Sequence, residues 1–327
     1  MPDFAPAEFK ERTARAHAAM AVAGLDALWL TTEAEVRYFT GFRTLFWQSP
    51  TRPWHVVLPQ GAPPIAIVPE IGAALMATTW VNDIRAWASP DPEDDGVSLL
   101  IDALSGFARS GVPMGVDSSI RMPLTDFHRI ADSISAEITD ATPLVLGLRS
   151  IKSEAEIALI AKITGYACDA FDRAPDLFRA GQPLSDAFRA FRIALLNAGL
   201  EETPYLVGGA GQGGYGDVIS PPSDAPLMEG DVLMLDTGLV RDGYFCDFDR
   251  NFSVGTSSQE VTSAHSLLVD AVAAGMDIAR PGATAADLFH AMDAMVTGGK
   301  GGGDAGRLGH GLGLQLTEGL SLIPEDW

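Results

Sequence analysis

The stretch "GDVLMLDTGLVRDGYFCDFDRNFSVG", from Gly230 to Gly255, decides the fold of the second half of the chain. "VLMLD" has the apolar character of a buried strand that runs into Asp236, and "YFCDFDRNFSV" predicts a second strand. The letters "RDG" between the two strands are a turn signal. The stretch therefore predicts a β-hairpin that carries acidic side chains.

Three carboxylates of this hairpin are expected to share one face. Asp236 and Asp247 are equidistant from the Arg241–Asp242 junction. A hairpin centred at that junction places them roughly opposite each other, with Cβ atoms ~4.5–5.5 Å apart, although the turn type can shift this register. Asp249 follows Asp247 by two positions and therefore lies on the same face of its strand.

Carboxylates that share a face in an apolar strand pair repel one another, and burial strengthens the repulsion. A shared proton, a cationic side chain or a metal ion must offset it, and converging oxygen ligands suit divalent cations. Arg250 alternates to the other face and is an imperfect partner. The alternative is a hairpin whose acids point to solvent, but Asp is depleted in strands, which favours a functional interpretation.

A second informative stretch is "GRLGHGLGLQLTEGL", residues 306–320, which contains His310. A histidine between glycines is a turn residue, a buried and hydrogen-bonded histidine, or a metal or catalytic residue. The two cysteines, Cys168 and Cys246, stand in distant contexts. They form neither a disulfide framework nor a thiolate metal site, and a reducing cytoplasm is expected.

Composition narrows the classes of partner. The formal net charge of −21 over 327 residues argues against binding to nucleic acid, whose phosphates need Lys and Arg, and against an anionic membrane surface. The first twenty residues carry charges where a signal peptide needs an apolar run. No stretch approaches the ~18 uninterrupted apolar residues of a membrane span. A cytoplasmic protein without a membrane or nucleic-acid partner is therefore expected.

Strands and helices alternate in the first half, which predicts an α/β domain with a mixed sheet over residues 1–147. Strands are expected at 27–32, 55–59, 64–69, 84–89 and 114–119, and helices at 8–24, 72–79 and 96–111. The longest helical pattern, Leu148–Ala174, contains a capping box of Ser153 and Glu156 and is taken to open a second domain, 148–327. Further helices are expected at 184–198, 260–279 and 285–296, with glycine-rich loops at 208–224 and 298–306.

Together, these stretches resemble the pita-bread family of creatinase, Xaa-Pro aminopeptidase and methionine aminopeptidase, peptidase family M24. "TTEAEVRYFTGF" (31–42) is similar to the N-terminal domain signature of that family, and "LRSIKSEAEI" (148–157) to its interdomain helix. The hairpin is similar to the metal-binding motif, and "GHGLGL" (309–314) to the segment with the ligand histidine. The resemblance implies a creatinase-like N-terminal domain followed by a pita-bread catalytic domain.

The resemblance also implies a dinuclear centre of Mn, Co or Zn with Asp236, Asp247 and His310 as ligands. In such an enzyme the metals polarise the scissile carbonyl and hold a hydroxide nucleophile. The implied reaction is hydrolysis of an amide bond next to proline, the implied substrate is a peptide or a small amide, and the implied assembly is a homodimer.

The chain departs from the family at the auxiliary histidines. The position seven residues after His310 is Thr317, and the loop before the hairpin has Ile219 and Ser220 where a second histidine is expected. Proton delivery and oxyanion support would then fall to Tyr215, Ser220 or Thr317.

The two glutamate ligands of the family come from strands after the histidine segment, whereas this sequence ends at "SLIPEDW", and Glu318 and Glu325 stand too early to match them. A pita-bread domain that is incomplete at its C-terminus, with incomplete metal occupancy, is therefore expected.

Two alternatives to a peptidase remain open. One is a non-peptidase hydrolase or lyase acting on a small amide, amidino or betaine compound, and the other is a catalytically inactive truncated homologue.

Overall fold

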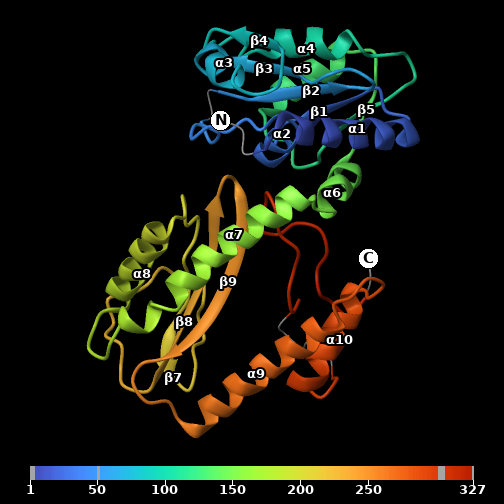
Figure 1. Cartoon of the computed structure of the whole chain (residues 1–327). Helices are drawn as coiled ribbons and strands as arrows, with labels where there is room; N and C mark the ends of the chain where they lie inside the picture. The colour runs from blue at the N-terminus through green and yellow to red at the C-terminus, as the bar shows by residue number, and fades with distance from the viewer. Residues whose placement is uncertain (1–3, 50–51, 301–305, 326–327) are drawn as a thin grey trace. The chain divides into compact units, whose positions relative to one another are not determined.

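The computed structural model describes residues 4–49, 52–300 and 306–325. It divides the chain into two compact units, Met1–Ile151 and Lys152–Trp327 (Figure 1). Within the described ranges, no helix is long and apolar enough to cross a membrane. Each unit has its own sheet, and the predicted hairpin lies in the second.

The first unit is a mixed α/β domain, as the alternating pattern predicted. Its six-stranded sheet has the order β4-β3-β2-β1-β5-β6, in which β2 is antiparallel to both neighbours and the other pairs are parallel. Its strands are β1 (Ala27–Leu30), β2 (His55–Pro59), β3 (Ile65–Pro69), β4 (Asp83–Trp87), β5 (Met114–Val116) and β6 (Ile138–Asp140). Its helices are α1 (Pro6–Ala23), α2 (Glu33–Thr40), α3 (Glu70–Met76), α4 (Val97–Ser105), α5 (Leu124–Ser133) and α6 (Thr142–Ser150).

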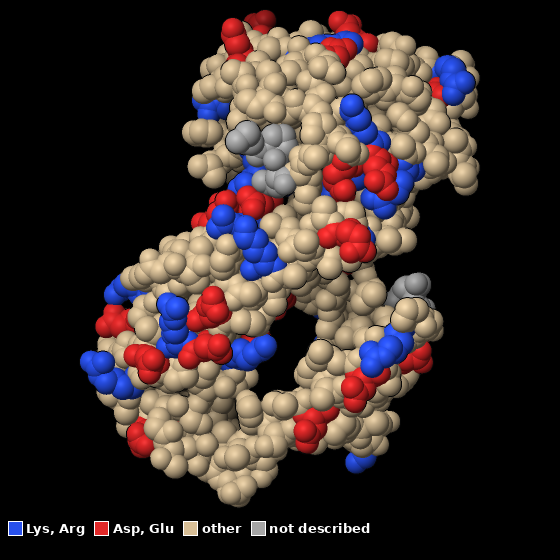
Figure 2. Space-filling view, viewed as in Figure 1, with Lys and Arg blue, Asp and Glu red and all other residues tan. Residues whose placement is uncertain are grey.

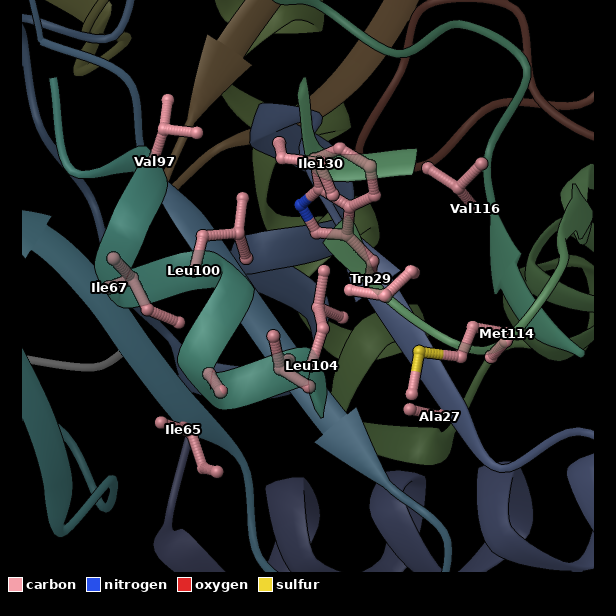
Figure 3. Close-up of a cluster of buried hydrophobic side chains, with 14 of the residues drawn as sticks. Ala27, Trp29, Ile65, Ile67, Val97, Leu100, Leu104, Met114, Val116 and Ile130 are labelled. Atoms are coloured by element: carbon pink, nitrogen blue, oxygen red, sulfur yellow. The ribbon is translucent and has the colours of Figure 1, made fainter. Parts of the chain in front are cut away.

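Apolar side chains from the sheet and from α4 form the core of this unit (Figure 3). Trp29 of β1 is 1% exposed and stacks on Phe127 of α5, with ring centroids 6.3 Å apart. Leu100 and Leu104 of α4 are almost completely buried against the same cluster. Because β1 is buried along its whole length, its sequence "ALWL" reads as a continuous apolar run without alternation.

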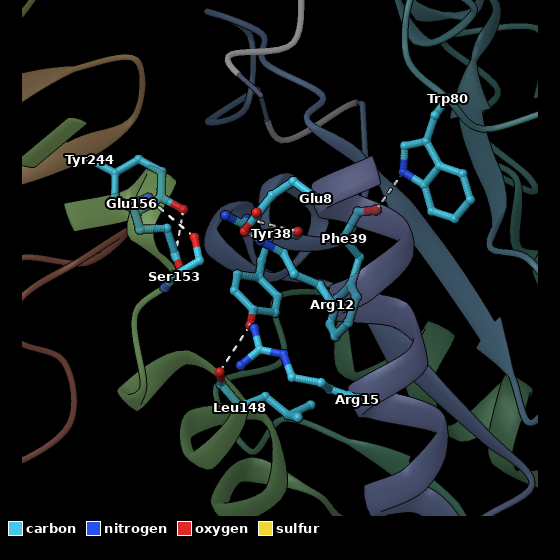
Figure 4. Close-up of polar contacts among 10 residues, drawn as sticks. All are labelled: Glu8, Arg12, Arg15, Tyr38, Phe39, Trp80, Leu148, Ser153, Glu156 and Tyr244. Carbon is cyan, nitrogen blue, oxygen red and sulfur yellow. Dashed lines mark hydrogen bonds and ion pairs between the residues drawn. The ribbon is translucent and has the colours of Figure 1, made fainter. Parts of the chain in front are cut away.

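Polar contacts join α1, α2 and α6 within the first unit (Figure 4). The guanidinium of Arg12 is buried, donates to Glu8 at 2.9 Å and to the carbonyl of Tyr38 at 3.1 Å, and lies over the Tyr38 ring. The Tyr38 hydroxyl donates to the carbonyl of Leu148 at 2.9 Å. These bonds fix α6 against the first two helices.

Helix α2 begins with a buried capping box. The Thr32 hydroxyl accepts from the Glu35 backbone N–H, and Oε2 of Glu35 accepts from the backbone N–H groups of Thr31 and Thr32. Within the described part of the chain, Oε1 of Glu35 has no hydrogen-bond partner. Burial, with a contribution from the nearby charge of Asp117, raises the pKa of Glu35 to about 7.

The second unit contains a three-stranded antiparallel sheet in the order β7-β8-β9. Helix α7 packs on β9 and α8, and α9 packs on α10 (Figure 1). Its elements are α7 (Glu154–Phe171), a short 3-10 helix η1 (Ala174–Asp176), α8 (Leu184–Ala198), β7 (Ala210–Gln212), β8 (Asp231–Arg241), β9 (Tyr244–Ser253), α9 (Gln259–Ile278) and α10 (Ala285–Val296).

The prediction of one helix over Leu148–Ala174 was wrong. Helix α6 ends at Ser150, and Ile151 adopts an extended conformation with φ −95° and ψ 104°. Ser153 then caps a new helix, in which its side chain accepts from the Glu156 N–H while Glu156 bonds back to the Ser153 N–H. The capping box predicted from the sequence therefore starts a helix of its own, because an N-cap residue itself has non-helical dihedral angles.

Acidic side chains outnumber basic ones, 43 to 22. On the face viewed in Figure 2, Lys and Arg side chains lie among Asp and Glu side chains and form no continuous basic patch among the residues described there.

Candidate metal centre in the second unit

The hairpin turn consists of Asp242 and Gly243. Both residues have positive φ, 52° and 80°, which is the signature of a type I′ turn. Asp tolerates this left-handed region better than most residues, and Gly adopts it without cost. The centre predicted at the Arg241–Asp242 junction was therefore wrong by one residue.

This turn sets the pairing of the carboxylates. Asp236 lies directly opposite Asp249, while Asp247 lies opposite Gly238. Moving the hairpin centre by one residue moves the pairing by two, so every side chain keeps its face. The three carboxylates share one face, as predicted, but the directly opposed pair is Asp236 with Asp249 and not Asp236 with Asp247.

Tyr205 connects two of the candidate ligands. Its hydroxyl donates to Oδ1 of Asp247 at 2.8 Å and lies 3.4 Å from Oδ1 of Asp236. The Tyr205 carbonyl accepts from the Thr237 hydroxyl at 2.6 Å, which holds this segment along β8. Gly238 makes room for the ring, since a Cβ there would come within 2.6 Å of it.

Burial and the two aspartates raise the pKa of Tyr205, so its hydroxyl remains a donor at neutral pH. The sequence patterns did not point to Tyr205 as a site residue. Its position in "EETPYLV" has no local signal, and tertiary contacts bring it to the hairpin, among them the backbone bonds between Val207 and Asp236.

His310 faces oxygen atoms at both ring nitrogens. Its Nε2 lies 3.1 Å from Oδ2 of Asp247, and its Nδ1 lies 3.0 Å from the carbonyl of Gly311. A neutral imidazole can donate from only one of these nitrogens. Histidines that bind metals through one nitrogen usually donate the other N–H to a carbonyl or carboxylate, so the Gly311 contact suits a ring whose Nε2 serves as a ligand.

Two of the hairpin carboxylates have raised pKa values. Burial, followed by the charges of Asp247 and Asp249, raises the pKa of Asp236 to about 6, although Tyr205 and His310 oppose the shift. Burial is also the main cause of the raised pKa of Asp249. Burial therefore disfavours the charged form of both carboxyls, and the neighbouring aspartates on the same face add to this effect.

The side chains of the candidate ligands are chemically suited to a metal ion, but the structure does not gather them into one cluster. The described residues contain no group of three or more His, Cys, Asp or Glu side chains arranged to hold a metal ion. Asp236, Asp247 and His310 meet in pairs instead, through Tyr205 and through the contact between Asp247 and His310. Two carboxylates and one imidazole are a donor set suited to Mn²⁺, Co²⁺ or Zn²⁺.

The three candidates for proton delivery lie in different surroundings. The Tyr215 hydroxyl donates at 2.6 Å to Oδ1 of Asn251, a residue on the same face of β9 as the aspartates. Ser220 is exposed, and its backbone N–H donates to Asp217. Thr317 is exposed as well. Of the three, only Tyr215 has a described hydrogen bond to a side chain of the carboxylate face.

Family models match both units. The model for metallopeptidase family M24 matches residues 158–326, and the model for the creatinase/prolidase N-terminal domain matches residues 12–151. The probable dipeptidase PepE of Mycobacterium tuberculosis (strain ATCC 25618 / H37Rv) is 28% identical over 313 residues, which cover 95% of this chain and 81% of the relative.

Solved structures share the fold. The dipeptidase PepE of Mycobacterium ulcerans superposes with a TM-score of 0.83 at 26% identity, covering 99% of this chain and 85% of that chain. An Xaa-Pro dipeptidase of Bacillus anthracis also has a TM-score of 0.83, at 18% identity, covering 97% and 86%. With the acidic hairpin and the glycine-flanked histidine in place, these matches show that the chain has the pita-bread fold and belongs to metallopeptidase family M24.

Proposed function

We propose that this chain is a metal-dependent hydrolase that cleaves the peptide bond before proline in short peptides, with Asp236, Asp247 and His310 as metal ligands. The observation that carries the proposal is the contact of Asp247 with both Tyr205 and His310, beside Asp236. Membership of family M24 and the names of the relatives, a dipeptidase and an Xaa-Pro dipeptidase, support the reaction and the substrate.

Divalent ions at such a site would supply Lewis-acid activation of the scissile carbonyl and of water. The residues of the chain hold the ligands in place. Gly311 accepts from Nδ1 of His310 and so leaves Nε2 for a ligand role. Tyr205 fixes the orientation of the Asp247 carboxylate by its hydrogen bond.

Two tyrosine hydroxyls are the groups that we assign to proton delivery and oxyanion support. Tyr205 bonds to Asp247, and Tyr215 bonds to Asn251 on the same strand. Burial raises the pKa of Tyr215 as well as that of Tyr205, so both hydroxyls are protonated at neutral pH and can donate to a developing negative charge. Ser220 and Thr317 remain the weaker candidates because both are exposed.

A second function is a non-peptidase hydrolase that acts on a small amide, amidino or betaine compound. It is favoured by the residues at the two auxiliary positions. Where the resemblance implies imidazoles, the chain has the exposed hydroxyls of Thr317 and Ser220. A site without those imidazoles would rely on a substrate that needs less help in protonating its leaving group.

The test is an assay of the purified chain after removal of metals and reloading with Mn²⁺, Co²⁺ or Zn²⁺. We expect hydrolysis of Xaa-Pro dipeptides and little hydrolysis of Xaa-Ala dipeptides. Asp247→Asn should lower both metal content and turnover, whereas Asp242→Asn, a matched change at the turn of the same hairpin, should leave both unchanged. Asn also tolerates the positive φ of position 242, so this control should fold normally.

Different results lead to different conclusions. Turnover of small amides without peptide cleavage would favour the second function. Metal content that does not change in Asp247→Asn would remove the ligand assignment. A chain that takes up no metal and turns over no substrate would identify a catalytically inactive homologue.

A further inference from the structure

We propose that the ion pair of Lys152 and Glu318 positions His310, so that Glu318 is a positioning residue and not a metal ligand. The inference rests on the proposed function, because it concerns how that site is held. Lys152 precedes α7 and Glu318 follows His310 by eight residues. Their side chains meet at 3.2 Å across 166 positions of sequence.

His310 lies in a loop, residues 308–322, that is closed by its own backbone bonds. We call this segment the His310 loop. Gly311 N–H donates to Leu320 at 2.8 Å, and Leu308 and Leu322 bond at 2.9 Å. Glu318 N–H donates to the carbonyl of Gly311 at 2.9 Å. The loop therefore folds back on itself around His310 and Gly311.

The Glu318 carboxylate fills the inside of this loop. The residue is 4% exposed. Its Oε1 contacts Nζ of Lys152, and its Oε2 accepts from the Gln315 N–H at 3.2 Å. Gly313 makes room for it, since a Cβ at that position would come within 2.7 Å of Oε1. A carboxylate this deeply buried depends on its cation, because an unpaired buried charge is strongly destabilising.

The same carbonyl connects Glu318 to the imidazole. Gly311 O accepts from the Glu318 N–H and lies 3.0 Å from Nδ1 of His310. A carbonyl oxygen has two lone pairs and can accept both bonds. A displacement of Glu318 therefore moves the group that orients the ring, and with it the direction of Nε2 toward Asp247.

The N-terminus of α7 also holds the hairpin. Oε1 of Glu156 accepts from the buried Tyr244 hydroxyl at 2.8 Å, and Oε2 accepts from the Ser153 N–H at 2.9 Å (Figure 4). Phe245 N–H donates to the carbonyl of Gly313 at 2.8 Å and so joins the hairpin to the His310 loop. Both ligand-bearing segments are thus attached to the same end of one helix.

The experiment uses the full chain with three variants, Lys152→Met, Glu318→Gln and the double variant. Arg189→Met, which removes an exposed ion pair to Asp186 on α8, is the matched control. Co²⁺ affinity is measured by titration of the metal-free protein. We expect affinity to fall by about 10- to 100-fold in the three variants, the range for outer partners of metal ligands, and to stay at the wild-type value in Arg189→Met. Lys152→Arg, which keeps the charge, should restore most of the affinity.

Amide hydrogen exchange without metal separates positioning from a general loss of stability. In Lys152→Met the amides of Gly311, Glu318 and Phe245 should lose protection. The amides of Met234 and Val240, which bond to carbonyls of other segments along β8, should keep theirs. Loss of protection at all five sites would mean that the pair only stabilises the unit, and would overturn the proposal.

The double variant guards against misfolding, because it leaves no unpaired charge in the loop. Wild-type Co²⁺ affinity in a folded double variant would overturn the proposal. If the wild-type chain itself binds no Co²⁺, the proposed metal site fails. The exchange pattern of Lys152→Met then still decides whether Lys152 and Glu318 hold the loop.

Discussion

The buried Glu35 of the first unit gives a sharp prediction for the dependence of stability on pH. Its carboxyl accepts two backbone N–H groups through Oε2, while burial raises its pKa from 4.5 to about 7. A folded-state pKa above the unfolded value means that the folded chain holds the proton more tightly. The favourable contribution is therefore fully present below pH 4.5 and is lost as the pH rises through 7.

The shift corresponds to about 3 kcal/mol, at 1.36 kcal/mol for each pKa unit. Glu35→Gln keeps an oxygen for the Thr31 and Thr32 N–H groups but cannot ionise. Between pH 5 and pH 9, the free energy of unfolding of the variant relative to wild type should therefore rise by about 2 to 3 kcal/mol. Glu33→Gln on the same helix removes a half-exposed carboxylate that pairs with Arg37, and it should show no such trend between pH 5 and pH 9.

Urea unfolding of the full chain, followed by tryptophan fluorescence, measures this difference. Five of the six tryptophans lie within residues 1–151, so the signal reports mainly on the unit that contains Glu35. A difference between Glu35→Gln and wild type that is the same at pH 5 and pH 9 would refute the assignment of a raised pKa to this carboxyl.

Three further predictions concern the second unit. Tyr244→Phe removes the bond to buried Glu156 and should cost about 1 to 3 kcal/mol of unfolding free energy, measured by urea denaturation; no loss would contradict the role of that bond. Gly238→Ala places a Cβ within 2.6 Å of the Tyr205 ring and 2.8 Å of Leu316. This overpacking should cost about 1 to 3 kcal/mol of unfolding free energy and also weaken Co²⁺ binding. Unaltered stability and binding would argue against this packing. Tyr205→Phe should leave the fold intact by circular dichroism and lower Co²⁺ affinity by about 10-fold, and an affinity equal to wild type would show that its hydroxyl does not orient the ligands.

The sequence predicted those parts of the fold whose signals are local. The Ser153 capping box, the strand at 55–59 and the helix at 184–198 were all correct, because capping and periodicity act over a few residues. Helix α2 was not predicted as a helix, although Thr32 and Glu35 form a capping box there. Its eight residues are too short to show a full amphipathic period, and most of them are buried.

The site was predictable in composition but not in geometry. Acids on alternate positions of a strand share a face whatever the turn, so their common face followed from spacing alone. Their pairing did not, because it depends on positive φ at Asp242 and Gly243, and the letters "RDG" allow more than one turn. Tyr205 and Glu318 reach the site through contacts 42 and 166 positions apart in sequence, which no local pattern encodes.

These separations have a consequence for the order of folding. The hairpin joins neighbouring strands through a two-residue turn, so its carboxylates can come together early and at a small entropic cost. The contact between His310 and Asp247 closes a much longer loop, which includes α9 and α10, so His310 joins the hairpin at a larger entropic cost and at a later stage. Opening of the His310 loop alone would release the imidazole while the hairpin stays paired, and we expect metal exchange to follow this local opening and not global unfolding.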